Sequence, residues 1–544
     1  MTDLSVKPVL CVFLPDGERL IPFLPGLSVL EILTESGIRT GASCGGAGAC
    51  GHCTICIKYG NVNPPTTIEL HRISPEKLSN GIRMACQVKP LQDIQVTIEK
   101  PSEEAVWQNL SKEEYMPVVF GKALPYLHRG HRYGIAVDLG TTQIRLSFWD
   151  MKRRVRLAGR YGLNPQTFLG ADILTRVIYA QESTIHADKI SRMPRYAIGE
   201  VMKDICRCEG YHLSETGHMV IVGNTAMLTL LSGRNYELLL QPQYWMNEID
   251  CRPADTGNWK RHWGIDDNAI VELIPSMAGF IGSDLTAGLI ATKLTDGSAG
   301  SLLIDFGTNS EIALWDGNRL WITSAAGGPA FEGCGISCGM PAGRGAIYRI
   351  STEGSPAMFK CDVTGGVEPV GICGSALVDI IACLIRDGLL NRTGKFAPSI
   401  GKNGLAIVKG RNDLVIKKGD IDVFQRAKAA IGAAITYLMK KSGMVYKDLR
   451  RICVCGAFGQ YLNIENAQTV GLLPDIPSEY IELVGNAALA GCEILLFYHD
   501  RLELTESLKN QSTILNLADD PLFEELFIQN LYIRPMEMKG GTQC

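Results

Sequence analysis

One short pattern occurs twice in this chain, far apart, and it constrains how most of the chain can fold. Residues 133–151 read YGIAVDLGTTQIRLSFWDM, and residues 301–317 read SLLIDFGTNSEIALWDG. Each copy is an apolar run that ends in an aspartate, followed by a glycine-threonine pair and a second apolar run. Each copy therefore predicts two strands joined by a tight turn, and the recurrence predicts an internal duplication.

The turn of each copy has the chemistry of a phosphate site. A Gly-Thr turn presents backbone N–H groups and a hydroxyl to a phosphate. The aspartates that end the first strands, Asp138 and Asp305, can hold Mg²⁺ through water, as carboxylates commonly do. One such turn is weak evidence, whereas two that face each other would bind the phosphates of a single nucleotide.

A third stretch adds a candidate contact for the nucleoside. Residues 450–463, RRICVCGAFGQYLN, predict a buried strand followed by a glycine turn. Gly456 and Gly459 leave room there for a base or ribose to lie against backbone. Residues 484–496, VGNAALAGCEILL, predict a helix of small residues that can pack closely against a counterpart.

One further stretch, AAGGPAFEG at residues 325–333, is dense in small residues. Its Gly327 and Gly328 fit a second phosphate or adenosine contact. They fit tight packing equally well, and residue chemistry alone leaves both interpretations open.

The two hairpins and the later glycine turn resemble, in this order, the phosphate-1, phosphate-2 and adenosine motifs of the acetate kinase, sugar kinase, Hsp70 and actin superfamily. The resemblance implies two RNase H-like lobes closing over ATP and Mg²⁺, with Asp138 and Asp305 as the metal-facing acids. The groups expected around the phosphates are Gly140, Thr141, Thr142, Gly307, Thr308 and Asn309. Glu311 would orient an attacking water, and the alternative is a solvated strand residue.

A second chemistry lies near the N-terminus, in GASCGGAGACGHCTICIKYG, residues 41–60. Its cysteines have the spacing C-x5-C-x2-C, one residue longer than the plant-type iron–sulfur pattern, and a fourth cysteine follows in RMACQVKP. The glycines let a loop turn sharply around a small inorganic core and aim N–H groups at sulfur. The pattern resembles vertebrate-type and bacterial [2Fe–2S] ferredoxins. The expected ligands are Cys44, Cys50, Cys53 and Cys86.

Two other metal sites compete for these cysteines. Cys50, Cys53 and Cys56 also begin the C-x2-C-x2-C pattern of a [4Fe–4S] site, but Tyr59 occupies the place where the fourth cysteine is needed. A zinc site is the other alternative, and zinc knuckles rarely have so many glycines. We therefore expect a [2Fe–2S] cluster, with Cys56 in the core of the following strand.

The segments around the cysteine loop predict the β-grasp order. Residues 9–26 predict a hairpin with its turn at PDG, and residues 28–37 a short helix with Ser28 as N-cap and Glu31 three residues on. Strands are expected in TICIKYG and DIQVTIEK. The N-terminal part is therefore expected to be a ferredoxin-type domain.

The 544 residues exceed one hydrophobic core, and about 150 residues per domain predicts three or four domains. The expected fold is a multidomain combination of α+β and α/β parts. Its predicted divisions are a ferredoxin-type domain at 1–98, a tether at 99–130 that is helical around Ser102–Leu110, a first RNase H-like lobe at 131–295 and a second at 296–544.

Composition excludes several classes of function. A net charge of −4 is too small to argue for binding to nucleic acid or to an anionic membrane. No signal sequence is recognised, and the most apolar run is broken by Asp284. Eighteen cysteines, mostly single, are read as buried thiols rather than disulfides. We expect a cytoplasmic protein that binds neither nucleic acid nor membrane.

The whole combination resembles the reductive activators of corrinoid-dependent methyltransferases. The resemblance extends from the cysteine loop through YGIAVDLGTT, VGNTAM, IDFGTNSEIAL, AAGGPAFEG and GICGSAL to CGAFGQYLN. It implies that ATP and an electron from the [2Fe–2S] cluster return an inactive Co(II) corrinoid protein to Co(I). It also implies a corrinoid protein as partner and an external low-potential electron donor, and it makes a homodimer plausible.

Two other functions fit the same motifs. One is a small-molecule kinase with a ferredoxin module, against which stands the lack of a recognisable substrate signature. The other is an ATP-dependent activator of a different low-potential enzyme. Activators of that kind usually share a [4Fe–4S] cluster across a dimer and lack an N-terminal ferredoxin.

Overall fold

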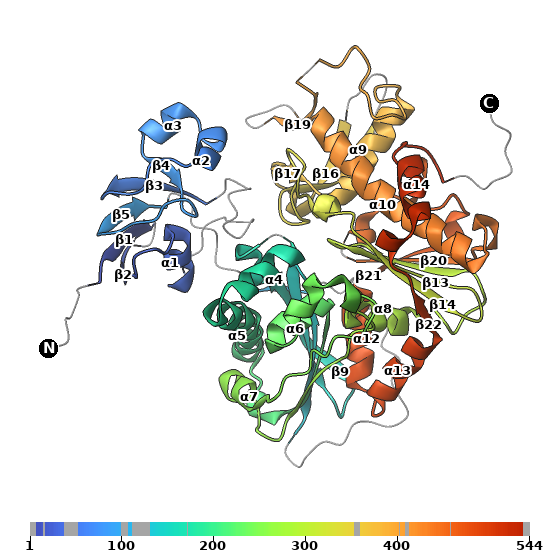
Figure 1. Cartoon of the computed structure of the whole chain (residues 1–544), viewed down its shortest axis with the longest axis horizontal. Helices are drawn as coiled ribbons and strands as arrows, with labels where there is room; N and C mark the ends of the chain where they lie inside the picture. The colour runs from blue at the N-terminus through green and yellow to red at the C-terminus, as the bar shows by residue number, and fades with distance from the viewer. Residues whose placement is uncertain are drawn as a thin grey trace.

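The structure is a computed structural model that describes residues 7–14, 17–36, 38, 53–98, 107–110, 131–170, 172–352, 359–401, 403–408, 413–456 and 458–536. Figure 1 shows a small N-terminal unit in blue beside a larger body. In the body, the green segments form one lobe and the yellow to red segments form most of the other. Cys44 and Cys50 of the predicted cluster loop, and the first two residues of the predicted PDG turn, lie outside the described residues.

The N-terminal unit is a five-stranded sheet in the order β2-β1-β5-β3-β4. The predicted hairpin is confirmed, since β1 and β2 pair antiparallel. The predicted capping box is present as well: the amide of Ser28 donates to Glu31 Oε2, and the amide of Glu31 donates to Ser28 Oγ. The elements are β1 (Val9–Leu14), β2 (Gly17–Pro22), α1 (Val29–Glu35), β3 (Thr54–Tyr59), α2 (Thr67–Arg72), α3 (Pro75–Ser79), β4 (Ile82–Met84) and β5 (Ile94–Thr97).

The body contains two six-stranded sheets with matching topology. Their orders are β11-β10-β7-β8-β9-β6 and β21-β20-β12-β13-β14-β22. In each, three consecutive antiparallel strands are followed by two parallel ones on the side of the first strand. The predicted duplication of RNase H-like lobes is therefore confirmed.

The strands have these bounds. In the first sheet they are β6 (Gln108–Asn109), β7 (Tyr133–Leu139), β8 (Gln143–Asp150), β9 (Val155–Leu163), β10 (Thr216–Gly223) and β11 (Ile270–Leu273). In the second they are β12 (Ser301–Asp305), β13 (Ser310–Trp315), β14 (Leu320–Ala325), β20 (Arg451–Cys455), β21 (Ile481–Gly485) and β22 (Ser512–Ile514).

The helix predicted in the tether is wrong for the last residues of that segment. The helix expected around Ser102–Leu110 is not present in its described part, where β6 pairs antiparallel with β9. The side chain of Leu110 is buried, and the ring of Trp107 lies against Gly162. The outer strand of the first sheet offers unpaired backbone groups, and this pairing satisfies them in a way that a local helix could not.

Helices cover both sheets. The first lobe has α4 (Ile173–Glu182), α5 (Thr184–Glu209), α6 (Thr225–Ser232) and α7 (Gly257–Trp263). The second has α9 (Gly374–Arg386), α10 (Lys418–Ser442), α11 (Ile464–Thr469), α13 (Arg501–Gln511) and α14 (Pro521–Asn530). The chain between β14 and β20 also forms two small sheets. One consists of β15 (Ala346–Thr352), β16 (Phe359–Val363) and β17 (Gly371–Ile372), and the other of β18 (Leu405–Val408) and β19 (Leu414–Ile416).

Two helices lie between the lobes, α8 (Ser283–Thr292) and α12 (Ala487–Leu496) (Figure 1). They pack directly on each other, and α12 also packs on β7 and β10 of the first sheet. A Cβ added at Gly491 would lie 1.8 Å from the carbonyl oxygen of Ala287. The close packing predicted for the small-residue helix is thus confirmed, although its first two predicted residues, Val484 and Gly485, end β21.

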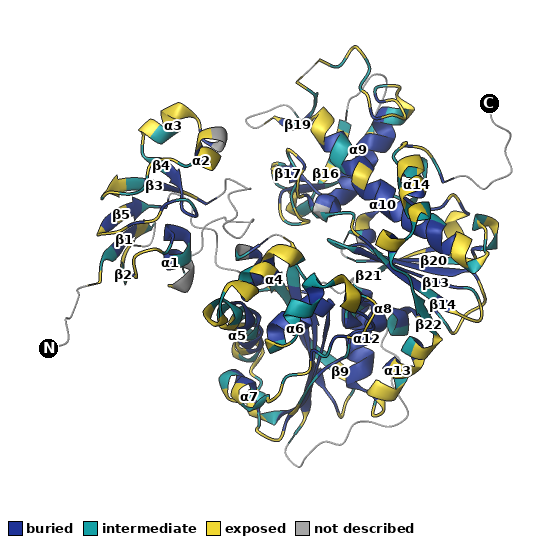
Figure 2. Cartoon of the chain, viewed as in Figure 1, coloured by how far each residue is buried: buried dark blue, intermediate teal, exposed yellow. Residues whose placement is uncertain are grey.

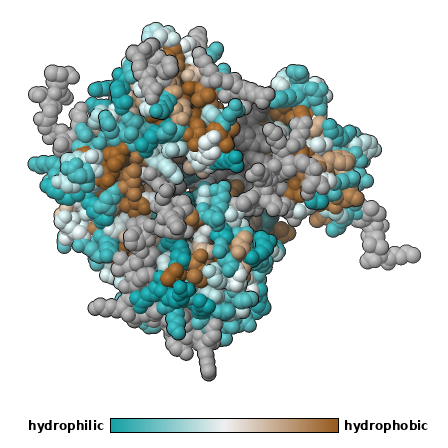
Figure 3. Space-filling view, turned by 180° about the vertical axis from the view of Figure 1, so that it is seen from behind, coloured by the Kyte–Doolittle hydropathy of each residue, from teal (hydrophilic) through white to brown (hydrophobic). Residues whose placement is uncertain are grey.

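The buried residues lie mainly in the sheets and in the helices packed on them. Figure 2 shows the central strands and the helices between and behind them mostly in dark blue. On the face seen in Figure 3, apolar residues lie in separate patches among polar ones. Within the described residues, no helix is long and apolar enough to cross a membrane.

The contact between α8 and α12 gives a stability prediction. Gly491→Ala places a methyl group within the backbone of α8, so the helices must separate, and we expect a loss of about 3 kcal/mol. Gly419→Ala, in α10 with open space around its Cα, is the control and should be neutral or slightly stabilising. Thermal unfolding of both variants tests this, and equal transitions would contradict the packing described.

Candidate functional site

The two predicted phosphate hairpins face each other across the lobes. Thr142 lies in the turn between β7 and β8, and Thr308 in the turn between β12 and β13. Their hydroxyls donate to the two oxygens of one carboxylate: Thr142 Oγ1 to Glu332 Oε2 at 2.6 Å, and Thr308 Oγ1 to Glu332 Oε1 at 3.1 Å. Both turns therefore reach a single anionic group.

Tight turns hold these hydroxyls in place. The amide of Gly140 donates to the carbonyl of Gln143, and a Cβ at Gly140 would lie 2.8 Å from that oxygen. The carbonyl of Gly140 accepts from Asn164 Nδ2. In the second hairpin, a Cβ at Gly307 would lie 3.0 Å from the carbonyl oxygen of Asn309. Only glycine fits this turn in the first copy without a shift of the backbone.

Beside the hairpins lies a set of four acids, of which Asp138 and Glu311 are buried and Asp284 and Asp305 are half-buried. Asp138 is in β7 and Asp305 ends β12, while Asp284 is in the first turn of α8. Burial raises the pKa of Asp305 to about 7, and the charge of Asp138 adds to the shift. Burial also raises the pKa of Asp284, with Asp305 and Asp138 contributing. For Asp138, burial outweighs the opposing effects of Arg145 and of the hydrogen bond from Asn486 Nδ2 (2.9 Å).

Glu311 is the fourth acid. It lies directly opposite Asp305 in the β12–β13 pairing. Its side chain is buried and accepts a hydrogen bond from Ser324 Oγ at 3.2 Å. Burial, followed by the charges of Asp284 and Asp305, raises its pKa well above the ordinary value. The alternative of a solvated strand residue is therefore wrong.

These acids do not converge on a common point. Within the described part of the chain, no three His, Cys, Asp or Glu side chains are placed to ligate one metal ion. Four carboxyl groups close to one another nevertheless favour a cation. The metal-facing roles of Asp138 and Asp305 stay predictions.

Several residues of this site were missed from the sequence. They are Asp284, Glu332, Asn486 and Arg176. Arg176 on α4 is fully buried, and its Nη1 donates to the carbonyl of Thr141 at 2.7 Å. Burial lowers its pKa to about 10. Glu332 lies in the small-residue stretch 325–333, and Asp284 interrupts an apolar run, but nothing local distinguishes these two acids from surface ones.

The glycines of the predicted adenosine turn have contacts within the chain. Gly456 has φ +90°, and a Cβ there would lie 2.4 Å from the carbonyl oxygen of Phe306. A Cβ at Gly459 would lie 2.9 Å from Val454. In the other glycine-rich stretch, Gly327 lies near the backbone of Ala427. Nucleotide contacts at these glycines and at Gly328 stay predictions.

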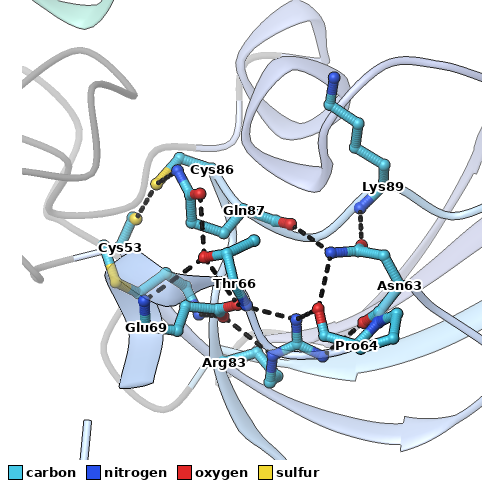
Figure 4. A network of polar contacts seen from close by, with 10 residues as sticks. Cys53, Asn63, Pro64, Thr66, Glu69, Arg83, Cys86, Gln87 and Lys89 are labelled. Atoms are coloured by element: carbon cyan, nitrogen blue, oxygen red, sulfur yellow. Dashed lines mark hydrogen bonds and ion pairs between the residues drawn. The ribbon is translucent and has the colours of Figure 1, made fainter. Parts of the chain in front are cut away.

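The described half of the cluster site brings two predicted ligands together. Cys53 precedes β3 and Cys86 follows β4, and their sulfurs are 3.4 Å apart in a buried setting (Figure 4). Two thiolates bound ~2.3 Å from one tetrahedral metal lie roughly 3.8 Å apart, so this pair fits a shared metal. Cys56 is buried in β3, and its thiol donates to the carbonyl of Asn80, as expected for a core residue.

A polar network supports Cys86 (Figure 4). Arg83 makes a two-pronged ion pair with Glu69 at 2.8 Å through each nitrogen, and both side chains are buried. Although burial opposes it, hydrogen bonds from Arg83, Thr66 and Met84 hold the pKa of Glu69 below its ordinary value. The network therefore keeps a full negative charge inside the unit.

Gln87 joins this network to the sulfur. Its Nε2 donates to Cys86 Sγ at 3.5 Å, and its Oε1 accepts from Thr66 Oγ1 at 3.1 Å. Because the amide oxygen is held by Thr66, the amide nitrogen is directed at the sulfur. No sequence pattern singled out this residue.

Comparison with known families agrees with this architecture. Residues 13–91 match the 2Fe-2S iron-sulfur cluster binding domain, residues 133–297 the RACo middle region, and residues 299–542 the C-terminal domain of RACo, the ASKHA domain. The corrinoid activation enzyme RamQ of Eubacterium limosum is 31% identical over 422 residues, which cover 73% of this chain and 70% of that protein.

The chain belongs to the family of corrinoid reductive activators.

Other members are consistent with this assignment. The [Co(II) methylated amine-specific corrinoid protein] reductase of Methanosarcina barkeri is 26% identical over 434 residues, 73% of this chain and 76% of that one. The solved structure of a reductive activator for corrinoid, iron-sulfur protein covers 98% of this chain and 100% of its own, with a TM-score of 0.66 and 25% identity. The predicted β-grasp domain followed by two lobes of the kinase–Hsp70–actin type is confirmed.

The hydrogen bond from Gln87 predicts a change in reduction potential. An N–H donor stabilises the more negative reduced form, so Gln87→Leu should lower the midpoint potential. We expect roughly 20–40 mV from a loss of ~0.5–1 kcal/mol. Gln95→Leu, at an exposed position of β5, is the control. Spectroscopic redox titration decides, and an unchanged potential would show that the bond has no electrostatic effect.

The raised pKa of Asp305 predicts that this side chain lowers the free energy of unfolding more as the pH rises. The unfolded chain releases this proton near pH 4, whereas the folded chain keeps it to about pH 7, so folding is disfavoured progressively as pH rises across that range. Without nucleotide, Asp305→Asn should therefore be more stable than wild type at pH 8, by ~2–4 kcal/mol, and equal near pH 4.

Asp316→Asn is the opposite control. Although burial opposes it, hydrogen bonds from Trp321 and from the amides of Arg319 and Asn318 lower the pKa of Asp316. That variant should be less stable than wild type at pH 8. Calorimetry from pH 4 to 8 compares both variants with wild type, and a pH-independent gain for Asp305→Asn would contradict the electrostatic origin.

Proposed function

We propose that this chain is an ATP-dependent reductive activator that delivers single electrons to a corrinoid protein whose cobalt is Co(II), and so restores Co(I) for methyl transfer. The observation that carries the proposal is the presence, in one chain, of a ferredoxin-type unit with paired cysteines and of two facing phosphate hairpins. The similarity to an activator structure over nearly the full chain supports it.

The two sites have complementary tasks. A [2Fe–2S] cluster, when bound by Cys44, Cys50, Cys53 and Cys86, supplies electrons one at a time. Each 100 mV of uphill transfer costs about 2.3 kcal/mol. Nucleotide binding can offset this cost if it stabilises the complex in which the acceptor is easier to reduce.

The nucleotide site has groups for each part of ATP hydrolysis. We assign the phosphate contacts to the hydroxyls of Thr141, Thr142 and Thr308, to Asn309 and to the turn glycines. Asp138, Asp284 and Asp305 would hold Mg²⁺ through water, which agrees with their lack of a common ligation point. With a dication bound, the four carboxyls ionise together, and Glu311 can then accept a proton from the attacking water.

The proposal names two further partners. One is an external low-potential donor that reduces the ferredoxin unit after each transfer. The other is the corrinoid protein, which must approach the cysteine loop closely for electron transfer. We place this reaction in the cytoplasm.

Anaerobic absorption spectroscopy tests the function. A Co(II) corrinoid protein is mixed with the reduced chain, and ATP is added last. The Co(I) band should appear only after ATP, it should be lost in Asp305→Asn, and it should remain in Asp316→Asn. If the cobalt of several corrinoid proteins stays Co(II) although ATP is bound and the cluster is reduced, the proposal that a corrinoid protein is the electron acceptor is wrong. Transfer of phosphate to a small molecule would instead favour the kinase alternative.

A further inference from the structure

Glu332 occupies a position that the proposed function leaves unexplained. It ends the short 3-10 helix Pro329–Glu332, which follows β14. Its carboxylate accepts from Thr142 in one lobe and from Thr308 in the other. One negative group therefore uses both hydroxyls that we assign to nucleotide phosphate, and it joins the two lobes at that point.

A carboxylate and a phosphate cannot share these hydroxyls. Each hydroxyl has one proton to donate, and that proton is engaged by Glu332. A phosphate entering the same place would also meet the negative charge of the carboxylate, which disfavours both together. Binding of phosphate at the two hairpins therefore requires Glu332 to leave.

A second observation indicates that this place suits an anion. Arg176 is fully buried, and its Nη1 donates to the carbonyl of Thr141, next to the Thr142 turn. Its Nη2 is buried with no hydrogen-bond partner. Burial lowers the pKa of Arg176, and the charges of Asp172 and then of Glu332 oppose this shift in part. A buried cationic nitrogen without a partner is costly unless an anion compensates it.

We propose that Glu332 is a phosphate-displaced latch: its carboxylate stands in for the terminal phosphate of a nucleoside triphosphate, holds the two hairpins together when the site is empty, and is expelled when that phosphate binds. The proposal rests on the proposed nucleotide site. The terminal phosphate is the one concerned because the bridged hairpins adjoin Asp305 and Glu311, where hydrolysis would occur.

Expulsion of Glu332 would also change the side-chain packing next to the site. The preceding residue, Phe331, packs against Phe306, which follows Asp305, and against Phe424 of α10 and Phe458. Its carbonyl also lies where a Cβ of Gly374, the first residue of α9, would be, at 2.2 Å. A shift of this short helix therefore changes the packing of α9 and α10. The conformation of the second lobe then depends on whether a third phosphate is bound.

Nucleotide affinity tests the latch, without any corrinoid protein. Calorimetric titration of the full chain with Mg²⁺ compares ADP with the β,γ-imido analogue of ATP. Glu332→Ala frees both hydroxyls, whereas the uncharged amide of Glu332→Gln accepts from only one of them. Both should therefore bind the triphosphate analogue tighter than wild type, by about tenfold for Glu332→Ala and by less for Glu332→Gln. Their affinity for ADP should be unchanged. Glu368→Gln, an exposed glutamate of the same lobe, is the matched control and should change neither.

The outcomes separate this proposal from the function on which it rests. Wild type that binds neither nucleotide overturns the nucleotide site and the latch together. Wild type that binds both, with variants that bind the triphosphate analogue no tighter, overturns the latch alone. Equal tightening of ADP and the triphosphate analogue would also overturn it, because the displaced group would then not be the terminal phosphate.

A measurement on wild type avoids any effect of the substitutions on folding. Hydrogen exchange of the amides in residues 329–340 should rise when the triphosphate analogue binds and stay unchanged with ADP. Protection of this segment by the triphosphate analogue would mean that Glu332 remains in place, and would overturn the latch.

Discussion

Four neighbouring carboxyl groups, held between the lobes with little access to water, are the constraint on which the body of this protein depends. Asp138, Asp284, Asp305 and Glu311 come from two strands that match across the lobes, from a helix between the lobes, and from the partner strand of one hairpin. Burial raises the pKa of each, and the charges of neighbouring acids add to this shift for Asp284, Asp305 and Glu311. A fold that holds these four carboxyl groups together must offset the loss of stability through other interactions, as functional sites commonly require.

The offset comes largely from the helices that join the lobes. The first turn of α8 contains Asp284, and Asn486, the N-cap of α12, donates to Asp138. Both helices thus begin at the acids, and their N-terminal partial positive charges reduce the repulsion there. Their close contact at Gly491 and Ala287 fixes the distance between the two halves of the site. The same packing that unites the lobes therefore sets the spacing of the acids.

Local patterns in the sequence predicted the parts of this site that follow from local structure. Asp138, Thr142, Asp305 and Thr308 each belong to a hairpin whose strands and turn are visible in a single stretch. The burial of Glu311 was within reach as well, because the short turn of that hairpin sets it opposite Asp305. Cysteine spacing likewise assigned Cys53 and Cys86 to one cluster, and the structure brings their sulfurs together.

The remaining residues depend on contacts that no local pattern encodes. Glu332 and Thr142 are 190 positions apart, and Asn486 and Asp138 are 348 apart. The strand β6 was missed because its two residues are extended only by pairing with the edge of a sheet. In each case the tertiary fold supplies the partner, and the residue type alone fits many surface roles.

The two sites use buried charge in opposite ways, and the difference follows their tasks. In the ferredoxin unit the buried Glu69 is fully paired by Arg83, and the network extends through Thr66 and Gln87 to the sulfur of Cys86. Paired charge resists movement, which suits a site whose geometry should not change as an electron arrives and leaves. Between the lobes, buried acids face one another and Arg176 retains an unpaired nitrogen. Charge left unpaired is relieved by a ligand, so this is the part of the molecule whose structure should respond when nucleotide and metal bind.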